Sequence, residues 1–338
     1  MPSDLNKTYT LAEILKQRAK DGSTMPLIDV LSGRYPLLEE GYWTQANGDT
    51  IHEFSQIATE SYGAAVRLNE GTPATAVVTK TVQEELMLLE DRMWIDTRQF
   101  EISPNAVQFR IQKEQQHLKG LIKSFHYTFF SKKDPTGKQW GIKSLDMSQI
   151  DGLGARYNKL ADDSVVSLGG SGSKLNSIWI VKWGLDAVSL LYPRNVGKTL
   201  RIQDLMIQPM HDSNGNRFEA VMTKFSWYFG LMIADPRCVK RLCNISNSGA
   251  SVTTSFDGSG TKGEEMLIDL VEALPGGDTS NVAIYVGPKV MAQIRKRINS
   301  KSNLYFAPAN VWGREMITFQ DIPVVRVDAL RDDEAVIN

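Results

Sequence analysis

Apolar residues gather in short runs over the second half of the chain, and these runs predict strands. Runs rich in Ile, Val, Trp and Tyr that are broken by Gly and Asn are typical of strands. Within one polar break, Asn214-Gly215 predicts a hairpin, because Asn and Gly accept the positive φ that hairpin turns need. The runs lie at residues 177–184, 187–192, 207–211, 218–233, 282–286, 316–319 and 322–328.

A helical repeat of apolar residues predicts one long helix over residues 103–131. Ser103 supplies an N-cap and Pro104 suits the first helical position, and a helix of this length spans about 40 Å. His117 and His126 are expected on its polar side, together with Lys113, Glu114, Gln115, Lys119 and Lys123. The apolar side is expected to comprise Val107, Ile111, Leu118, Leu121, Ile122, Phe125 and Phe129.

Four shorter helices are also predicted. Residues 10–20 begin with a capping box formed by Thr10 and Glu13. A helix this short is too weak to stand alone, so it is expected to pack on this subunit or on a neighbour. Its narrow apolar face contains Leu11, Ile14 and Leu15. The other three helices are expected around residues 26–31, 264–274 and 288–300.

Residues 41–82 have a different pattern, with alternating stretches separated by Gly63, Gly71 and Pro73. This pattern predicts a long two-stranded ribbon with few side chains large enough to build a core. An isolated ribbon is only marginally stable in water, so it is expected to rest on a partner surface. Ribbon, helices and strands together predict an α+β chain.

Composition then narrows the class of protein. The 338 residues suffice for about two domains. The net charge of −1 means that no global field draws the chain to nucleic acid. Neither a transmembrane helix nor a signal peptide is expected. Only two cysteines occur, Cys238 and Cys243, which excludes a disulfide framework and fits a reducing cytoplasm.

Residues 195–199, Asn-Val-Gly-Lys-Thr, look like the end of a phosphate-binding loop. Such a loop needs a first glycine five positions before Gly197, so that backbone N–H groups can surround the phosphates. Tyr192 occupies that position and Pro193 removes a further donor. A plain loop is therefore favoured over a nucleotide site built on Lys198 and Thr199.

Other chemical motifs are incomplete as well. Asp212 begins a calcium-like loop, but Arg217 and Thr223 occupy the positions of the glycine and the bidentate glutamate, which favours a hairpin turn. The spacing of the histidines and cysteines does not match a zinc site, and the cysteines are expected to be small core residues. No catalytic residue, metal site or cofactor is predicted.

Several sequence blocks follow one another in a defined order: Ala65–Gly71 with residues 79–82 and 89–96, Ser177–Gly184 with residues 192–193, Asp212–Phe218 continuing to Trp227 and Leu231, Asp235–Ile245, and Ile317–Leu330. In this order and spacing they resemble the major capsid protein of tailed bacteriophages, which has the Hong Kong 97-type fold. The likeness is strongest to the shell proteins of short-tailed phages (podoviruses). It covers about residues 10–330, and the first 60 residues match least well.

The resemblance implies a division of the chain into the parts of that fold. These are an N-terminal arm (1–38), an extended loop (39–84), a peripheral domain (85–167) whose spine helix is 103–131, an axial domain (168–308), and a return to the peripheral domain (309–338). Some members of the fold cross-link a lysine to an asparagine. Lys80 lies in the extended loop, but no surrounding motif supports a cross-link.

The resemblance also implies a function in the virion capsid, with assembly in the host cytoplasm. Copies of the chain would form hexamers and pentamers of an icosahedral shell that encloses double-stranded DNA, with scaffolding, portal and decoration proteins as partners. The packaged DNA would be contacted weakly if at all, and no membrane would be involved. The expected subunit contacts are Leu11, Ile14, Leu15, Tyr42, Trp43, Val66, Arg67, Leu68 and Gly71.

Three alternatives remain open at this point. The same fold could form an encapsulin-like compartment that holds a protein cargo. A tail or decoration protein would form rings or tubes and no closed shell. A nucleotide-binding enzyme that uses Lys198 and Thr199 is the alternative from a different class.

Overall fold

The computed structural model describes residues 36–59, 61–102, 105–130, 150–197, 200–246, 262–277, 279–298, 306–311, 314–330 and 334–338. The described residues form two compact units. The hairpin unit comprises residues 88–125 and 200–228, and the sheet unit comprises residues 36–87, 126–197 and 229–338. Strands β3 (Val78–Asp96) and β8 (Arg217–Ile233) and helix α4 (Ala106–Phe130) contribute residues to both units.

The sheet unit is built on a seven-stranded sheet with the order β11-β12-β13-β10-β5-β9-β4. Its centre is antiparallel, since β5 pairs with β10 on one side and with β9 on the other. Two pairs are parallel, β10 with β13 and β4 with β9. The strands are β4 (Val165–Ser167), β5 (Leu175–Lys182), β9 (Val239–Ser246), β10 (Val282–Val286), β11 (Phe306–Val311), β12 (Arg314–Phe319) and β13 (Ile322–Arg326).

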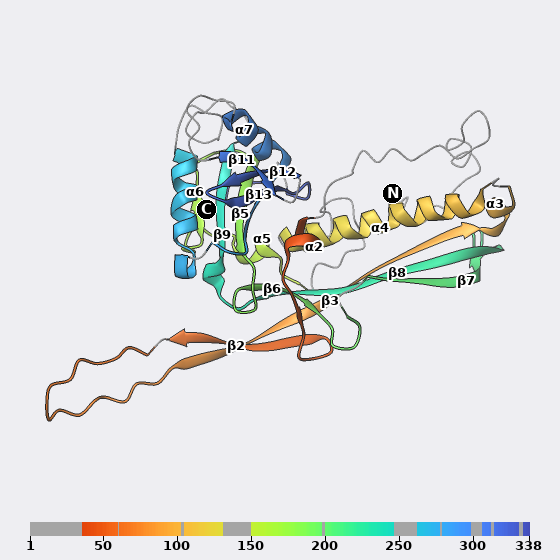
Figure 1. Ribbon diagram of the computed structural model, residues 1–338. Helices are drawn as coiled ribbons and strands as arrows, with labels where there is room; N and C mark the ends of the chain where they lie inside the picture. Colours follow the sequence, from red (N-terminus) through yellow and green to blue (C-terminus); the bar gives the residue numbers. More distant parts are fainter. Residues whose placement is uncertain are drawn as a thin grey trace. The chain divides into compact units, whose positions relative to one another are not determined.

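Helices α6 (Lys262–Glu272) and α7 (Pro288–Ile298) lie beside this sheet (Figure 1). Pro288 occupies the first turn of α7, where a missing N–H costs nothing. Glu264 and Glu265 lie in the first turn of α6, where the helix dipole stabilises negative charge. The apolar sides of both helices join the buried residues of β5, β9 and β10 in one core cluster. Both helices confirm the predictions from periodicity.

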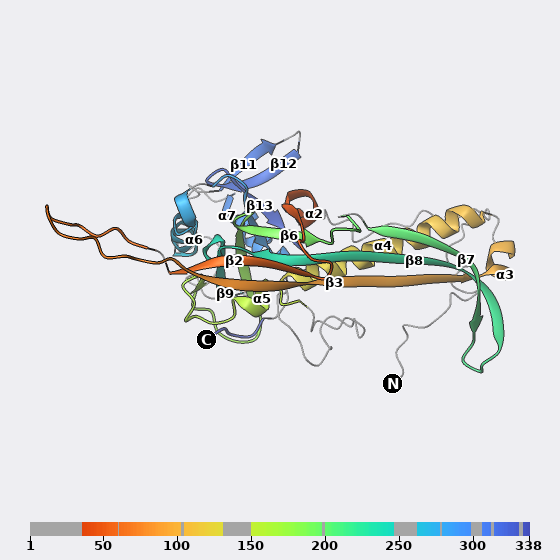
Figure 2. The same cartoon turned by 90° about the horizontal axis from the view of Figure 1, so that it is seen from below.

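A second group of strands in the sheet unit carries the ribbon. Strand β2 (Ile51–Thr59) pairs antiparallel with residues 78–85 of β3, and the two lie side by side in both views (Figures 1 and 2). Residues 61–77 contain no strand, so the paired part of the predicted ribbon is shorter than its sequence pattern indicates. The other elements of this unit are α2 (Pro36–Glu40), β1 (Trp43–Gln45), α5 (Leu153–Arg156), β6 (Val188–Tyr192), η3 (Pro236–Cys238) and η4 (Pro275–Gly277).

The hairpin unit contains β7 (Arg201–His211), which pairs antiparallel with the first half of β8, together with α3 (Thr97–Ile102) and most of α4. The predicted hairpin is confirmed, but only Gly215 among turn residues 212–216 has a positive φ, of 83°. The N–H of Gly215 donates to the carbonyl of Asp212 at 3.1 Å, and the N–H of Asp212 donates to the carbonyl of Asn216 at 2.9 Å. This is a three-residue loop with a left-handed glycine.

Helix α4 confirms the predicted long helix, but its first half buries a different side. Val107 is 69% exposed and Ile111 46% exposed, whereas Phe109 and Lys113 are buried at 1% and 4%. The Lys113 ammonium lies 5.6 Å from the centre of the Phe109 ring, so its charge has an aromatic partner in the interior. The second half follows the prediction for Leu121, Phe125 and Phe129, which are buried. His126, which was expected on the polar side, is buried as well.

Candidate subunit-contact surfaces

Four of the nine residues that the sequence singles out as contacts lie in one exposed segment, residues 61–77, here called the ribbon tip. Every residue of the ribbon tip is exposed. Leu68 is 95% exposed and Tyr62 76% exposed. Covering such a leucine contributes about 1.5–3 kcal/mol. The ribbon tip therefore presents apolar side chains that gain stability when another surface covers them.

The ribbon tip is bent at its centre by local hydrogen bonds. The N–H of Glu70 donates to the carbonyl of Arg67 at 3.1 Å, and the N–H of Arg67 donates to Glu70 Oε2 at 3.3 Å. Asn69 has a φ of 70°, which asparagine tolerates better than most residues. Val66, Arg67, Leu68 and Gly71 lie within this turn or directly beside it in the sequence. A Cβ added at Gly71 would meet no atom within 4 Å.

At the other end of the ribbon, a salt bridge ties β3 to α5. The two terminal guanidinium nitrogens of Arg156 donate to the Glu84 carboxylate, at 2.5 and 2.6 Å. Such paired charge-assisted bonds are strong and fix direction. Burial lowers the pKa of Arg156, but the Glu84 hydrogen bonds and charge outweigh burial and raise it. The base of the ribbon is therefore anchored within the sheet unit, while every residue of its tip is exposed.

His52 lies beside this salt bridge, directly opposite Glu84 in the β2–β3 pairing. It is 9% exposed, and its ring stacks on Phe54 at 5.8 Å between centres. The N–H of Asn47 donates to Nδ1 of His52 at 3.2 Å, so this nitrogen accepts and carries no proton. Burial lowers the pKa of His52, although the charge of Glu84 opposes this. The neutral ring is the form that fits here.

Tyr42 and Trp43 are held at the start of β1. Trp43 is opposite Leu190 in the parallel β1–β6 pair, and the N–H of Leu190 donates to the Tyr42 carbonyl at 2.8 Å. The backbone of this segment is thus part of a sheet. Tyr42 is 47% exposed and Trp43 is partly buried. Of the two residues, Tyr42 offers the larger surface to a partner.

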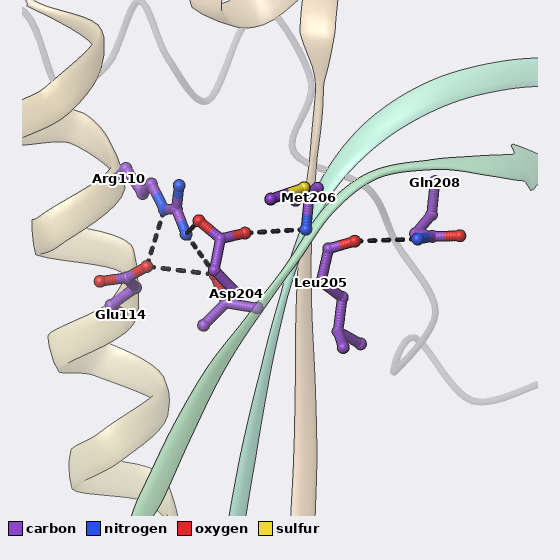
Figure 3. A network of polar contacts seen from close by, with 7 residues as sticks. Arg110, Glu114, Asp204, Leu205, Met206 and Gln208 are labelled. Atoms are coloured by element: carbon purple, nitrogen blue, oxygen red, sulfur yellow. Dashed lines mark hydrogen bonds and ion pairs between the residues drawn. The ribbon is translucent and has the colours of Figure 1, made fainter.

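In the hairpin unit, a polar network shapes strand β7 (Figure 3). Arg110 donates to Glu114 at 2.8 Å, to Asp204 at 2.7 Å and to Thr223 at 3.1 Å. The N–H of Met206 donates to the other oxygen of Asp204 at 2.9 Å. The Arg110 hydrogen bond lowers the pKa of Asp204, so the carboxylate stays charged. Asp204 is therefore held from two sides.

The Met206 bond to Asp204 lies where the β7–β8 register shifts, between Asp204 and Ile207, and Met206 has a φ of 58°. A bulge of this kind bends a strand and redirects its side chains. Met206 is 76% exposed as a result. Sequence reasoning missed this surface, because β7 was expected to start at residue 207. The hairpin unit exposes the large apolar residues Leu88, Ile102, Val107, Ile111, Ile202, Met206 and Ile207.

The two cysteines and the loop at residues 195–197 are among the chemical groups of the sequence that the structure describes. Cys238 and Cys243 are buried, and burial raises the pKa of each thiol to about 11. In the described ranges no three His, Cys, Asp or Glu residues are grouped to hold a metal ion, and no described helix is long and apolar enough to cross a membrane. The N–H groups of Val196 and Gly197 both lie 3.4 Å from the Pro193 carbonyl, inside a turn.

Several predicted residues fall elsewhere. Lys198 and Thr199 lie outside the described residues, as do Leu11, Ile14 and Leu15 of the predicted arm helix. The helix expected around residues 26–31 and the N-cap at Ser103 also lie outside them. Lys80 is exposed in β3 opposite Gln56, within the ribbon.

Comparisons with known proteins place these surfaces in context. The family model described as "Major capsid protein GP7" matches residues 19–338. No curated protein sequence matches the chain. A chain of the bacteriophage Epsilon15 structure is 22% identical, with 100% of both chains covered and a TM-score of 0.70. This likeness extends over the whole length and shows a common fold.

Two further structures are more distant. The capsid of bacteriophage JBD30 is 10% identical, with 89% of this chain and 93% of that chain covered and a TM-score of 0.49. The SrpI encapsulin from Synechococcus elongatus PCC 7942 is 10% identical, with 70% and 96% covered and a TM-score of 0.44. The α+β architecture is the Hong Kong 97-type fold of tailed-phage capsid proteins. Because the family model matches nearly the whole sequence, the chain belongs to the GP7 family of major capsid proteins.

Proposed function

We propose that copies of this capsid protein assemble into hexamers and pentamers that close into an icosahedral shell around double-stranded DNA. The observation that carries this proposal is the ribbon tip, where a leucine is 95% exposed on a segment with no strand of its own. In a shell of identical copies, each tip lies on a neighbouring subunit, and assembly completes the burial of its apolar side chains.

The parts of the chain take the roles that the family resemblance implies. The arm (1–38) reaches across neighbours, the extended loop (39–84) carries the ribbon, and the peripheral domain (85–167, with 309–338) carries the spine helix. The axial domain (168–308) surrounds the centre of each capsomer. The anchored base of the ribbon at Glu84 and Arg156 supports this division, because a lever that binds a neighbour needs a fixed end.

Charge supports a structural role with weak contacts to the genome. With 38 basic and 39 acidic residues the subunit is nearly neutral, which favours close packing of many copies. A surface that bound DNA tightly would need many more basic than acidic groups. We therefore infer a non-enzymatic virion component, assembled in the host cytoplasm with scaffolding, portal and decoration proteins as partners.

The ribbon tip gives the sharpest test. The unchanged chain, expressed with the neighbouring genes, is expected to form closed particles in negative-stain electron microscopy. Leu68→Ser and Gly71→Val are expected to leave folded, soluble subunits that form no closed shells, because both changes lie in exposed positions with room around them. Leu185→Ser is the matched control: Leu185 is 54% exposed outside the ribbon, and its variant should assemble normally.

The outcomes separate the parts of the proposal. Normal shells from both tip variants would exclude the ribbon tip as a contact, and normal shells after deletion of residues 1–20 would exclude the arm. If the chain stays monomeric when all neighbouring genes are co-expressed, the proposed shell function is wrong. Extraction of the particles distinguishes a genome from a protein cargo, since only a genome yields long double-stranded DNA.

A further inference from the structure

The sequence contains two Asn-Gly steps, Asn47-Gly48 and Asn214-Gly215. Both asparagines are exposed. In such a step the backbone nitrogen of the glycine can attack the asparagine side chain, because glycine has no Cβ to hinder the approach and populates many backbone conformations. Asparagine is for this reason one of the thermally labile residues of proteins. The two steps differ in the hydrogen bonds of the asparagine side chain and in the space around the glycine.

Asn47 is held on both sides of its amide. Its Nδ2 donates to the Glu53 carbonyl at 2.6 Å, and its Oδ1 accepts the Glu53 N–H at 2.9 Å. The following glycine is crowded, since a Cβ at Gly48 would lie 2.4 Å from the Ile51 carbonyl oxygen. Attack by the Gly48 nitrogen requires both hydrogen bonds to break and this tight loop to open.

Asn214 has none of these restraints. Its backbone N–H donates to Asp212 Oδ1 at 2.9 Å, but no described residue hydrogen-bonds its side-chain amide. Around Gly215 the space is open, with no atom within 4 Å of an added Cβ. The Gly215 N–H donates to the Asp212 carbonyl at 3.1 Å and also interacts with the Asp212 carboxylate, so the nucleophile is engaged by this one residue. Exposed hairpin tips open readily.

We propose that Asn214 is a site of spontaneous deamidation in the folded protein and that Asn47 is not. The Gly215 nitrogen forms a bond to Cγ of Asn214, the bond from Cγ to the side-chain nitrogen breaks, and ammonia leaves with the proton from Gly215. Water then opens the resulting five-membered imide at one of its two carbonyls. The product is aspartate or isoaspartate, and water is the only other reactant.

The modification would change the hairpin in two ways. A new carboxylate would stand two residues from Asp212, whose Oδ1 already accepts from the N–H groups of Asn214 and Asn216. Isoaspartate would also add one methylene to the backbone of a three-residue loop, and the length of such a loop sets the strand register. This inference does not depend on the proposed assembly.

The test is a comparison of the two sites in the folded and the denatured full-length chain. The purified protein is incubated in mildly alkaline buffer made with heavy-oxygen water, with and without denaturant. Digestion and mass spectrometry then measure the conversion of amide to acid in the peptides that contain residues 47 and 214. Heavy oxygen in the product marks ring opening by water during the incubation. Asn214→Gln is the control variant, because a longer side chain forms the ring poorly.

In denaturant the two sites should react at similar rates. Folding should slow Asn47 by more than about tenfold, because two hydrogen bonds of its side-chain amide must break first. It should slow Asn214 by less than about tenfold, because no bond of its side-chain amide must break and only the Gly215 N–H must leave Asp212. Equal slowing of both sites, or faster reaction at Asn47 than at Asn214 in the folded chain, would overturn the proposal. Heavy-oxygen exchange at the peptide of Asn214→Gln equal to that of the parent would also overturn it.

Discussion

Strands β5 and β7 show what different surroundings do to the same type of element. Both are rich in apolar residues, yet in β5 (Leu175–Lys182) every residue except the last is buried, while in β7 (Arg201–His211) nine residues are exposed and two are partly buried. Strand β5 has neighbours on both edges, β9 and β10. Strand β7 pairs only with β8 among the described strands.

The difference teaches that apolar content alone does not locate the core. A central strand buries its side chains within its own unit, and its role is stability. An exposed apolar strand edge is a liability that proteins usually manage with charges, bulges or cover. The bulge at Asp204 and Met206 is one such device, and cover by a neighbouring copy would be another. Stability and surface roles should therefore separate cleanly in these two strands.

The largest expected effect comes from one substitution made in both strands. Ile180 of β5 is fully buried, and Ile202 of β7 is 55% exposed. Ile180→Ala should lower the free energy of unfolding by about 2–5 kcal/mol, since it removes buried methyl groups and leaves a cavity. Ile202→Ala should change it by less than about 0.5 kcal/mol. Denaturant titration of both variants measures this; equal losses would contradict the comparison.

A smaller effect is expected from a buried charge on the sheet. Arg241 of β9 lies 4.5 Å above the Trp179 ring and donates to Glu334 at 3.0 Å and to the Tyr157 carbonyl at 2.7 Å. Its side chain is 5% exposed. Glu334→Gln should lower the free energy of unfolding by about 3 kcal/mol, because it leaves a buried guanidinium without its carboxylate.

An ion pair of the hairpin unit whose cation is exposed supplies the control for Arg241. Arg98 donates to Asp96 at 2.7 Å, and the side chains of Arg98 and Asp96 are 70% and 15% exposed. Asp96→Asn should destabilise the chain far less than Glu334→Gln, because water solvates the guanidinium of Arg98 once its carboxylate is gone. Thermal unfolding of the two variants tests this, and the reverse order would show that burial does not govern the strength of these pairs.

The smallest expected effect concerns pH and the base of the ribbon. Burial lowers the pKa of His52 below its ordinary value of 6.5, so the unfolded chain binds a proton more readily than the folded one. The stability that the neutral ring contributes is therefore fully present above pH 6.5 and is lost as the pH falls through the lower, folded pKa. Exchange of amide hydrogens in β2, corrected for its intrinsic pH dependence, should accelerate over that range.

His52→Gln is the control for the pH experiment, since glutamine keeps a hydrogen-bond acceptor but does not titrate. Its β2 amides should exchange with no such pH dependence. If the parent and the variant respond alike, another group controls the ribbon base.

Much of the fold follows from the sequence, because its strands and helices have strong local signals. The runs around Ile180, Ile284 and Val324 are β-branched and bounded by turns, and all became strands of the central sheet. Periodicity placed α6 and α7 within two residues of their observed limits. The hairpin at Gly215 was also predicted, and its loop has three residues.

What the sequence did not predict depends on contacts between distant residues. The buried side of α4 near Phe109 and Lys113 is set by partners that periodicity cannot identify. The start of β7 was missed because its bulge interrupts the alternation, and Asp204 at this bulge is bound by Arg110, which lies 94 residues away. The ribbon was predicted in the right region, but its strands pair only over residues 51–59 and 78–85, and residues 61–77 contain no strand. Whether it touches a neighbour stays a prediction.

The order of strands in the large sheet also determines how the chain has to fold in time. Lys182 at the end of β5 pairs with Val282 at the start of β10. The central strand β5 can therefore pair with β10 only after a hundred further residues have been synthesised. Such distant pairing slows folding, whereas a local hairpin closes within about 1–10 μs. During synthesis β5 emerges long before β10 can cover its edge, and this interval is when the newborn chain is most exposed to aggregation.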